Sequence, residues 1–203
     1  SQPDFLVNYR SGTSNKSEKN IINSRAWIQT AINFSKAIET KSYNAAKLKS
    51  YLPELRDMTI QSSEIFLPRM QEIFADCGVA FVLLPHLKNS GVNGAVKWMN
   101  DERVVLAMND RGLDADKFWF SLFHEIKHVL QQKIKTVFIS SSVEEMKDIN
   151  NNLEIEADNF AMNYLIPPAS FKKFAPTQYT SDAEIVAFAK EIGAVIKLIC
   201  FAK

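Results

Sequence analysis

Two histidines four residues apart form the pattern in this sequence that points most directly to chemistry. They enclose a glutamate in the segment His124-Glu125-Ile126-Lys127-His128. Positions four apart lie on one face of a helix, so both imidazoles can reach the same Zn²⁺. Glu125 lies beside that face, where it can take a proton from an attacking water. The segment therefore predicts a zinc site with Glu125 as its base, and the alternative is two surface histidines on an ordinary helix.

The residues around this segment favour the metal site. Drawn as a helix, apolar side chains between Phe118 and Leu130 cover about two-thirds of the circumference. His124, His128 and Glu125 share most of the remaining arc. A helix that is apolar over so much of its surface is buried. We therefore expect its polar stripe to line a cleft.

A catalytic zinc also needs a third protein ligand, and the next strongly apolar helix offers Glu154 and Glu156. The remaining histidine, His86, lies far upstream in a strand region. Helical geometry places Glu154 and Asp158 in the middle of the core-facing side, with Ile155 and Met162 along one flank, and it places Glu156 about 160° away. Buried carboxylates are costly without a cation or a donor. We expect Glu154 to bind zinc and Asp158 to accept the free N–H of a ligating histidine. The alternative is that both pair with buried Arg or Lys.

The elements that must position these helices indicate an α+β fold. It has a helical N-terminal part, a small antiparallel or mixed sheet with a hairpin, an active-site helix and a second ligand helix. Residues 1–22 are polar and predict a flexible lead-in, and residues 23–203 predict a single domain. The expected helices are Ser24–Lys41, Tyr43–Tyr51 stopped by Pro53, one ending at Gly78, Phe118–Gln132, Leu153–Ile166, and one opened by a Ser181–Glu184 capping box and ended by Gly193. The expected strands are Val79–Leu84, Ala95–Met99, Val104–Met108, Thr136–Ser140 and an apolar tail at Ala194–Ala202, with a polar connection at Ser140–Asn152.

Composition excludes several classes of protein. The 203 residues include 24 basic and 23 acidic side chains, a formal net charge of +1, so no strongly basic nucleic-acid footprint is present. No apolar run approaches the roughly 20 residues that span a membrane. Two cysteines, Cys77 and Cys200, are too few for a disulfide framework. We therefore expect a cytoplasmic protein.

The motif helices also carry a family resemblance. The segments FWFSLFHE at 118–125, EIEADNFA at 154–161 and LIPP at 165–168 resemble the ImmA/IrrE family of gluzincin-type metallopeptidases. The closest variety is the domain behind a helix-turn-helix in HigA-type antitoxins and related XRE-family regulators, and the likeness covers most of residues 25–193. It implies a zincin-like fold with His124, His128 and Glu154 as Zn²⁺ ligands and Glu125 as general base. Family members usually have Gly where this chain has Lys127.

The resemblance implies a zinc-dependent endopeptidase that cleaves a repressor or an antitoxin in a stress-response or toxin–antitoxin system. The alternative is a catalytically silent module of the same fold that recognises a toxin or a signal. The sequence begins at Ser1 and shows no helix-turn-helix, so we expect the C-terminal part of a longer regulator, with DNA contacts only outside this chain. Strand Gly94–Met99 is a candidate edge for an extended substrate peptide, or an ordinary hairpin arm. Tyr164 and Arg111 are the candidates for stabilising an oxyanion.

Overall fold

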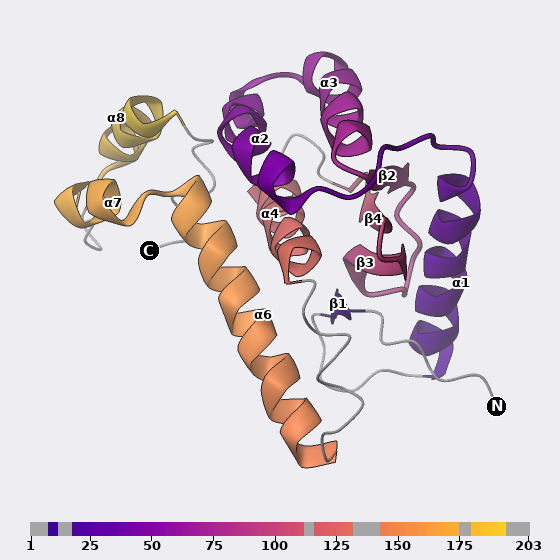
Figure 1. Ribbon diagram of the computed structural model, residues 1–203. Coiled ribbons are helices and arrows are strands. Elements are labelled where there is room, and N and C mark those ends of the chain that lie inside the picture. The colour runs from indigo at the N-terminus through magenta and orange to yellow at the C-terminus, as the bar shows by residue number, and fades with distance from the viewer. Residues whose placement is uncertain (1–7, 12–17, 112–115, 132–142, 175–179, 194–203) are drawn as a thin grey trace. The chain divides into compact units, whose positions relative to one another are not determined.

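The computed structural model describes residues 8–11, 18–111, 116–131, 143–174 and 180–193, and Figure 1 labels the elements along the chain. The chain forms two compact units. The first comprises residues 1–50 and 68–111, and the second comprises residues 51–67 and 112–203. A single domain over residues 23–203 stays a prediction. The strand expected at Thr136–Ser140 and the tail at Ala194–Ala202 lie outside the described residues.

The first unit is built on a mixed four-stranded sheet, which confirms the α+β class. Its strands are β1 (Asn8–Ser11), β2 (Val79–Leu84), β3 (Val92–Asn100) and β4 (Arg103–Asn109), in the order β1-β3-β4-β2. The predicted hairpin is confirmed, because β3 and β4 pair antiparallel. Strand β2 pairs with β4 in parallel, which makes the sheet mixed.

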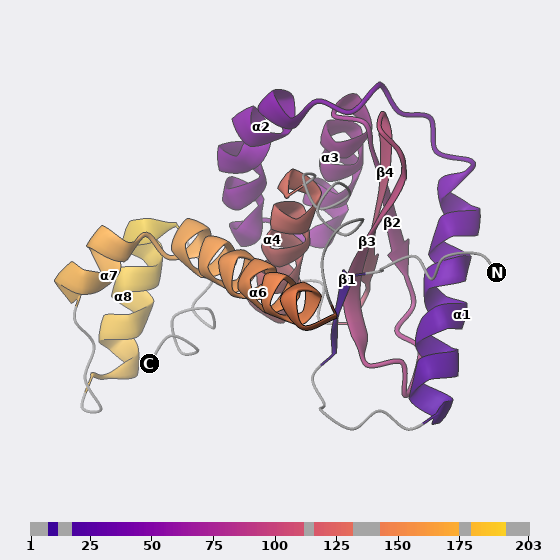
Figure 2. The same ribbon diagram turned by 60° about the horizontal axis from the view of Figure 1, so that its bottom comes forward.

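Helix α1 (Glu18–Ser35) covers one face of this sheet, as Figure 2 shows. Its buried side chains Trp27 and Ala31 belong to the same apolar cluster as Ala80 and Val105 of the sheet. The indole N–H of Trp27 donates to the carbonyl of Pro85 at 3.1 Å, which satisfies its one polar atom. The sheet therefore has a firmly packed face on this side.

Strand β1 lies within the segment for which the sequence predicts a loose lead-in. It pairs antiparallel with β3, with Asn8 opposite Val96 and Tyr9 opposite Ala95. The sequence predicts this stretch of β3 as a candidate edge for a substrate peptide or as an ordinary hairpin arm. In the structure the chain's own β1 occupies that edge, so another peptide can pair there only after displacing β1.

Two helices contain prolines, and in α2 this corrects a predicted boundary. Helix α2 (Ala45–Asp57) continues through Pro53, where the sequence predicted a stop. Pro53 and Lys49, the residue four earlier, are both exposed, so water can reach the carbonyl that loses its partner. Helix α3 (Ser63–Asp76) contains Pro68 and is followed by Gly78 at φ +81°.

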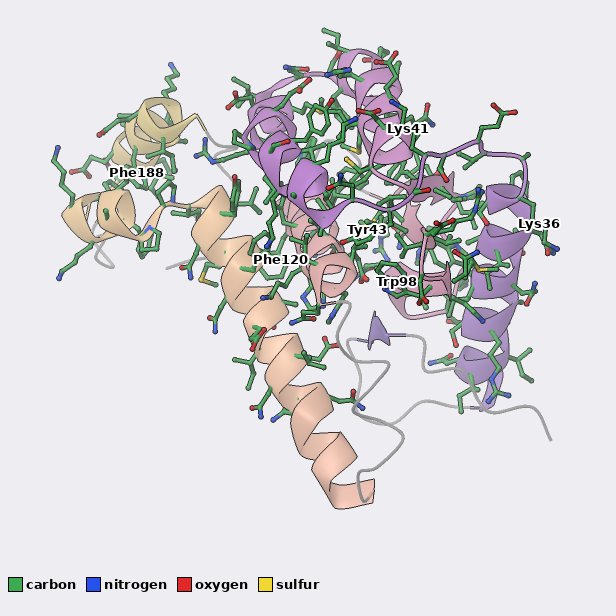
Figure 3. All side chains as sticks on the ribbon, in the orientation of Figure 1. Lys36, Lys41, Tyr43, Trp98, Phe120 and Phe188 are labelled. Atoms are coloured by element: carbon green, nitrogen blue, oxygen red, sulfur yellow. The ribbon has the colours of Figure 1, made fainter. Side chains whose placement is uncertain are left out.

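The conformation at Gly78 has a second requirement besides its positive φ. A Cβ at this position would lie 2.3 Å from backbone atoms of Tyr43, so the close approach of two chain segments demands glycine. The ring of Tyr43 in turn packs edge-on against Trp98 of β3 at 4.7 Å, and Figure 3 labels both side chains. These contacts join the segment before α2 to the sheet.

The second unit holds α4 (Asp116–Leu130), α6 (Val143–Leu165), α7 (Pro168–Phe174) and α8 (Asp182–Ile192), with a short 3₁₀ turn at Met58–Ile60. Helix α6 begins ten residues earlier than predicted, so the expected polar connection at Ser140–Asn152 is wrong from Val143 on. This first part is polar and has no apolar period, although its Glu, Met and Lys residues favour a helix. The capping box of Ser181 and Glu184 and the left-handed Gly193 are confirmed.

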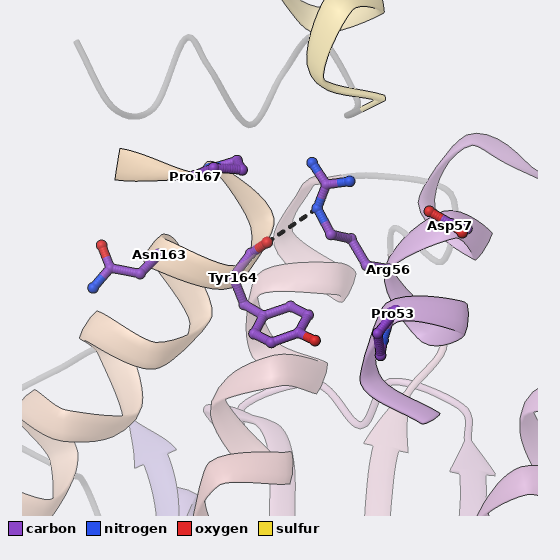
Figure 4. Close-up of a pocket in the computed structure, with 6 residues that line it drawn as sticks. All are labelled: Pro53, Arg56, Asp57, Asn163, Tyr164 and Pro167. Carbon is purple, nitrogen blue, oxygen red and sulfur yellow. Dashed lines mark hydrogen bonds between the residues drawn. The ribbon is translucent and has the colours of Figure 1, made fainter. Parts of the chain in front are cut away.

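Arg56 of α2 joins the ends of two helices in this unit. Its guanidinium donates to the carbonyls of Tyr164 at 3.0 Å and Leu165 at 3.3 Å, at the end of α6. It also donates to Ile192 at the end of α8 at 2.5 Å. Three carbonyls at helix ends, which have no partners in their own helices, thus accept hydrogen bonds from one side chain. Figure 4 shows this arginine beside a pocket of about 350 Å³ lined by Pro53, Arg56, Asp57, Asn163, Tyr164 and Pro167.

Among the described residues, no helix has the length and hydrophobicity needed to cross a bilayer.

Candidate metal centre

Helix α4 is buried along most of its length, as its sequence predicts. Trp119 is fully buried and packs against Phe66, with ring centroids 4.8 Å apart. Phe123 stacks on Tyr164 at 5.3 Å. With the apolar stripe held in this way, His124 and His128 are also buried, at 1% and 3% exposure. Packing of the helix therefore fixes where both imidazoles lie.

Helix α6 lies beside α4 and brings a carboxylate to the two histidines (Figure 1). The small side chains of Ala157 and Ala161 are buried, which is compatible with a close approach of the two helices. One carboxylate oxygen of Glu154 lies 3.2 Å from Nε2 of His124, and the other lies 3.3 Å from Nε2 of His128. The two Nε2 atoms are 3.0 Å apart.

These separations are compatible with a tetrahedral zinc site. Ligand atoms about 2.0–2.1 Å from a tetrahedral ion lie about 3.3–3.4 Å from one another. His124, His128 and Glu154 form the group of potential ligands that the described residues bring together. The Nε2 and carboxylate atoms are therefore spaced to share one ion, with a fourth position left for water or substrate.

The other ring nitrogen of each histidine is held by an acceptor. Nδ1 of His124 lies 2.9 Å from Oδ1 of Asp158, as the sequence predicts. Nδ1 of His128 lies 2.9 Å from Oε1 of Gln131, a partner that the sequence did not predict. Both Nδ1 atoms therefore carry the hydrogen, and in the neutral rings both Nε2 lone pairs face the Glu154 carboxylate. The two Nε2 lone pairs and the Glu154 carboxylate are all acceptors, and such a group is stable only around a shared proton or a cation.

The pKa values of the same groups also favour positive charge at this point. Burial alone would raise the pKa of Glu154, but when the rings of His124 and His128 are protonated their Nε2–H groups donate hydrogen bonds to it, which outweigh burial and lower the pKa to about 2. Burial alone would lower the pKa of His128, but its hydrogen bond to Glu154 and the charges of Glu125 and Glu154 raise it. The donor set therefore suits a divalent cation.

Glu125 and Glu156 lie outside this ligand set in different ways. Glu125 follows His124 directly and is 1% exposed. Glu156 is exposed, as predicted, yet it contacts Lys127 at 3.2 Å and accepts a hydrogen bond from Gln131 at 3.2 Å. Hydrogen bonds from these two side chains lower the pKa of Glu156. The cation of Lys127 is thus paired with a carboxylate on α6.

The sequence of residues 86–202, more than half of the chain, matches the Peptidase_M78 family, described as an IrrE N-terminal-like domain. The protein belongs to this family. No curated protein matches the chain. The predicted ImmA/IrrE relationship is thereby confirmed for this part, while residues 25–85, which the resemblance also included, lie outside the match.

Within this M78 domain, the predicted positions have different outcomes. The structure brings His124, His128, Glu154 and Asp158 together, and both carboxylates contact histidines. Ile155 and Met162, which the helical drawing placed beside the core, are 50% and 46% exposed. The buried stripe of α6 is therefore narrower than expected, and among its described side chains it consists of Ala157, Ala161 and Leu165.

The candidates for oxyanion stabilisation gain no support from their surroundings. The Tyr164 ring packs between Phe123 and Phe160, and burial raises the pKa of its hydroxyl. Arg111 is exposed and belongs to the first unit, as does His86.

Proposed function

We propose that this protein is a zinc-dependent endopeptidase that cleaves a regulatory protein. The observation that carries the proposal is the convergence of two Nε2 atoms and a carboxylate within 3.0–3.3 Å, beside a buried glutamate. A purely structural cluster of this kind would leave Glu125 buried without a chemical task. Membership of a peptidase family supports the same chemistry.

In this mechanism, Nε2 of His124, Nε2 of His128 and the Glu154 carboxylate would hold the ion. When bound, zinc polarises the scissile carbonyl and makes water a better nucleophile at neutral pH. Glu125 accepts the proton of the attacking water and then donates it to the leaving amine nitrogen. Asp158 holds the ring of His124 through its Nδ1–H.

The proposed substrate is a repressor or an antitoxin of a stress-response or toxin–antitoxin system. The motif helices resemble domains that belong to regulators of that kind, which supports a dedicated protein substrate over bulk peptides.

Substitution of Glu125 by Gln tests the proposal. Glu125→Gln removes the base and leaves the three ligands intact, so we expect zinc content and folding to be unchanged. Loss of a general base costs about 10²–10⁴-fold in rate. In cells, the wild type should cleave the regulator encoded beside it, or its own full-length chain, and the variant should leave that protein intact.

A matched control for this test is Glu102→Gln, which changes a glutamate at an exposed turn of the first unit. It should cleave like the wild type. Equal processing by wild type and Glu125→Gln would exclude the mechanism. If neither cleaves the partner but both bind it equally, the protein is the silent binding module of the alternative hypothesis.

A further inference from the structure

We infer that Gln131 is a positioning residue that sets the ring of His128 for metal binding and ties it to the segment that carries Glu154. This inference rests on the zinc site of the proposed function. The family match and the ligand motif do not assign any role to Gln131, which lies just after the end of α4 and is 8% exposed.

The side-chain amide of Gln131 has one orientation that satisfies its surroundings. Its Nε2 donates to the carbonyl of Leu153 at 3.1 Å and to the carboxylate of Glu156 at 3.2 Å. Both partners can only accept, so the opposite orientation would place oxygen against oxygen. Oε1 is therefore the atom that faces Nδ1 of His128 at 2.9 Å.

This orientation determines the hydrogen position on His128. An amide oxygen accepts and does not donate, so Nδ1 of His128 must carry the hydrogen. In the neutral ring, the lone pair is then on Nε2, the atom near His124 and Glu154. The effect on His128 parallels that of Asp158 on His124, but it comes from a neutral side chain.

The same amide also holds the neighbour of a ligand. Leu153, whose carbonyl accepts from Gln131, directly precedes Glu154. Gln131 thus contacts the backbone next to the carboxylate ligand and the ring of a histidine ligand at once. One side chain that coordinates nothing itself therefore links these two ligands.

Glu156 belongs to this arrangement as an outer support. Its carboxylate accepts a hydrogen bond from the amide of Gln131 and also forms a salt bridge with Lys127. Loss of Glu156 leaves the bond to the Leu153 carbonyl in place. We therefore expect Glu156 to matter less than Gln131.

The test compares zinc affinity of the full chain carrying Gln131→Leu with that of the wild type, by competition with a chromogenic chelator. Leucine has a similar size but neither accepts nor donates, so affinity should fall about 10–100-fold, the usual cost of losing such a partner. Asn159→Leu is the matched control, since it removes an exposed amide on α6 and should change affinity little. Glu156→Ala should give a smaller loss than Gln131→Leu.

A second readout uses the metal-free protein and is independent of zinc. ¹⁵N spectra of the His128 ring, recorded at a pH where it is neutral, should show hydrogen on Nδ1 in the wild type. In Gln131→Leu the hydrogen should move to Nε2 in part of the molecules. Gln131→Glu should keep the hydrogen on Nδ1, because a carboxylate also accepts. Its second oxygen would face the Leu153 carbonyl and the Glu156 carboxylate, so we expect only part of the zinc affinity to be rescued.

The outcomes separate this inference from the proposed function. If the wild type binds zinc and Gln131→Leu changes neither affinity nor the ring spectrum, the inference is wrong while the zinc site stands. If the wild type binds no zinc but the ring spectrum changes as expected, the proposed function fails and the action of Gln131 on His128 stands. If Gln131→Leu does not fold, Gln131→Met replaces it in both measurements, and wild-type affinity together with an unchanged ring spectrum in that variant would overturn the inference.

Discussion

Helices α4 and α6 both contribute side chains to the metal centre, but they hold them by different means. From Phe118 to Val129, α4 buries every side chain except Phe120 and Lys127. Among the described side chains of α6, only Ala157, Ala161 and Leu165 are buried. The carboxylates of Glu154 and Asp158 keep 38% and 44% of their surface exposed.

The difference shows how the two sets of groups are kept in place. Apolar packing of α4 fixes where the two imidazoles lie, and hydrogen bonds to Asp158 and Gln131 then set which ring nitrogen carries the hydrogen. The carboxylates on α6 are fixed by hydrogen bonds to those imidazoles, which depend on charge and hydrogen position. Substitutions in α4 should therefore act first on stability, and substitutions in α6 should act first on metal affinity.

The largest effect should come from the core of α4. Trp119→Ala removes a fully buried ring that packs against Phe66 and Phe118, and we expect a loss of about 3–5 kcal/mol in the free energy of unfolding. Urea titration of the metal-free protein, followed by far-ultraviolet circular dichroism, measures it. A loss below about 1 kcal/mol would contradict the packing role of α4.

The next effect should come from the carboxylate ligand on α6. Glu154→Gln replaces a charged ligand by a poor one, so zinc affinity should fall by more than the roughly 100-fold that loss of an outer partner can cost. Isothermal calorimetry or chelator competition measures it. Glu156→Gln is the control two residues away, and it should leave affinity nearly unchanged, because an amide oxygen can still accept from Gln131. A larger loss in Glu156→Gln than in Glu154→Gln would mean that the ligand is wrongly identified.

A smaller effect should follow from the partner of His124. Asp158→Ala removes the acceptor at 2.9 Å from Nδ1 and should weaken zinc binding by about 10–100-fold. Asp158→Asn keeps an acceptor oxygen without the charge and should lose less. Visible spectra of the Co²⁺-loaded protein would report any change in ligand geometry. Identical affinities in all three proteins would show that packing alone orients His124.

The smallest effect should come from the exposed side of α6. Met162→Ala should change the free energy of unfolding by no more than about 0.5 kcal/mol, because nearly half of the side chain is in water. The same urea titration measures it. If Met162 were a core residue, as the helical drawing suggested, the loss would be about 2–5 kcal/mol.

These contrasts also explain which features the sequence could predict. Helix α4 and the hairpin were predicted because apolar periodicity reports burial directly. The approach of Glu154 and Asp158 to the histidines was predicted because helical angles place both on one face. The start of α6 was missed because a polar helix has no apolar period. The end of α2 was predicted too early because a helix can continue through Pro53 where the proline is exposed, and its exposure depends on the rest of the fold.

Strand β1 and Gln131 were missed for a different reason. Strand β1 has four residues, and its partner β3 begins some eighty residues later. The role of Gln131 depends on the carbonyl of Leu153. Every residue has a backbone carbonyl, so the residue type at this position does not indicate the contact. Features of this kind exist only once distant segments have come together.

The shared arginine at the end of α6 has a consequence for local unfolding. Arg56 donates hydrogen bonds to carbonyls of both α6 and α8. If its side chain moves away, the last turns of the two helices would lose these bonds in one event. Their amide hydrogens should then exchange with solvent as one cooperative group, at a common rate set by that opening. The two helices, although separate in sequence, would thus form a single foldon at their C-terminal ends.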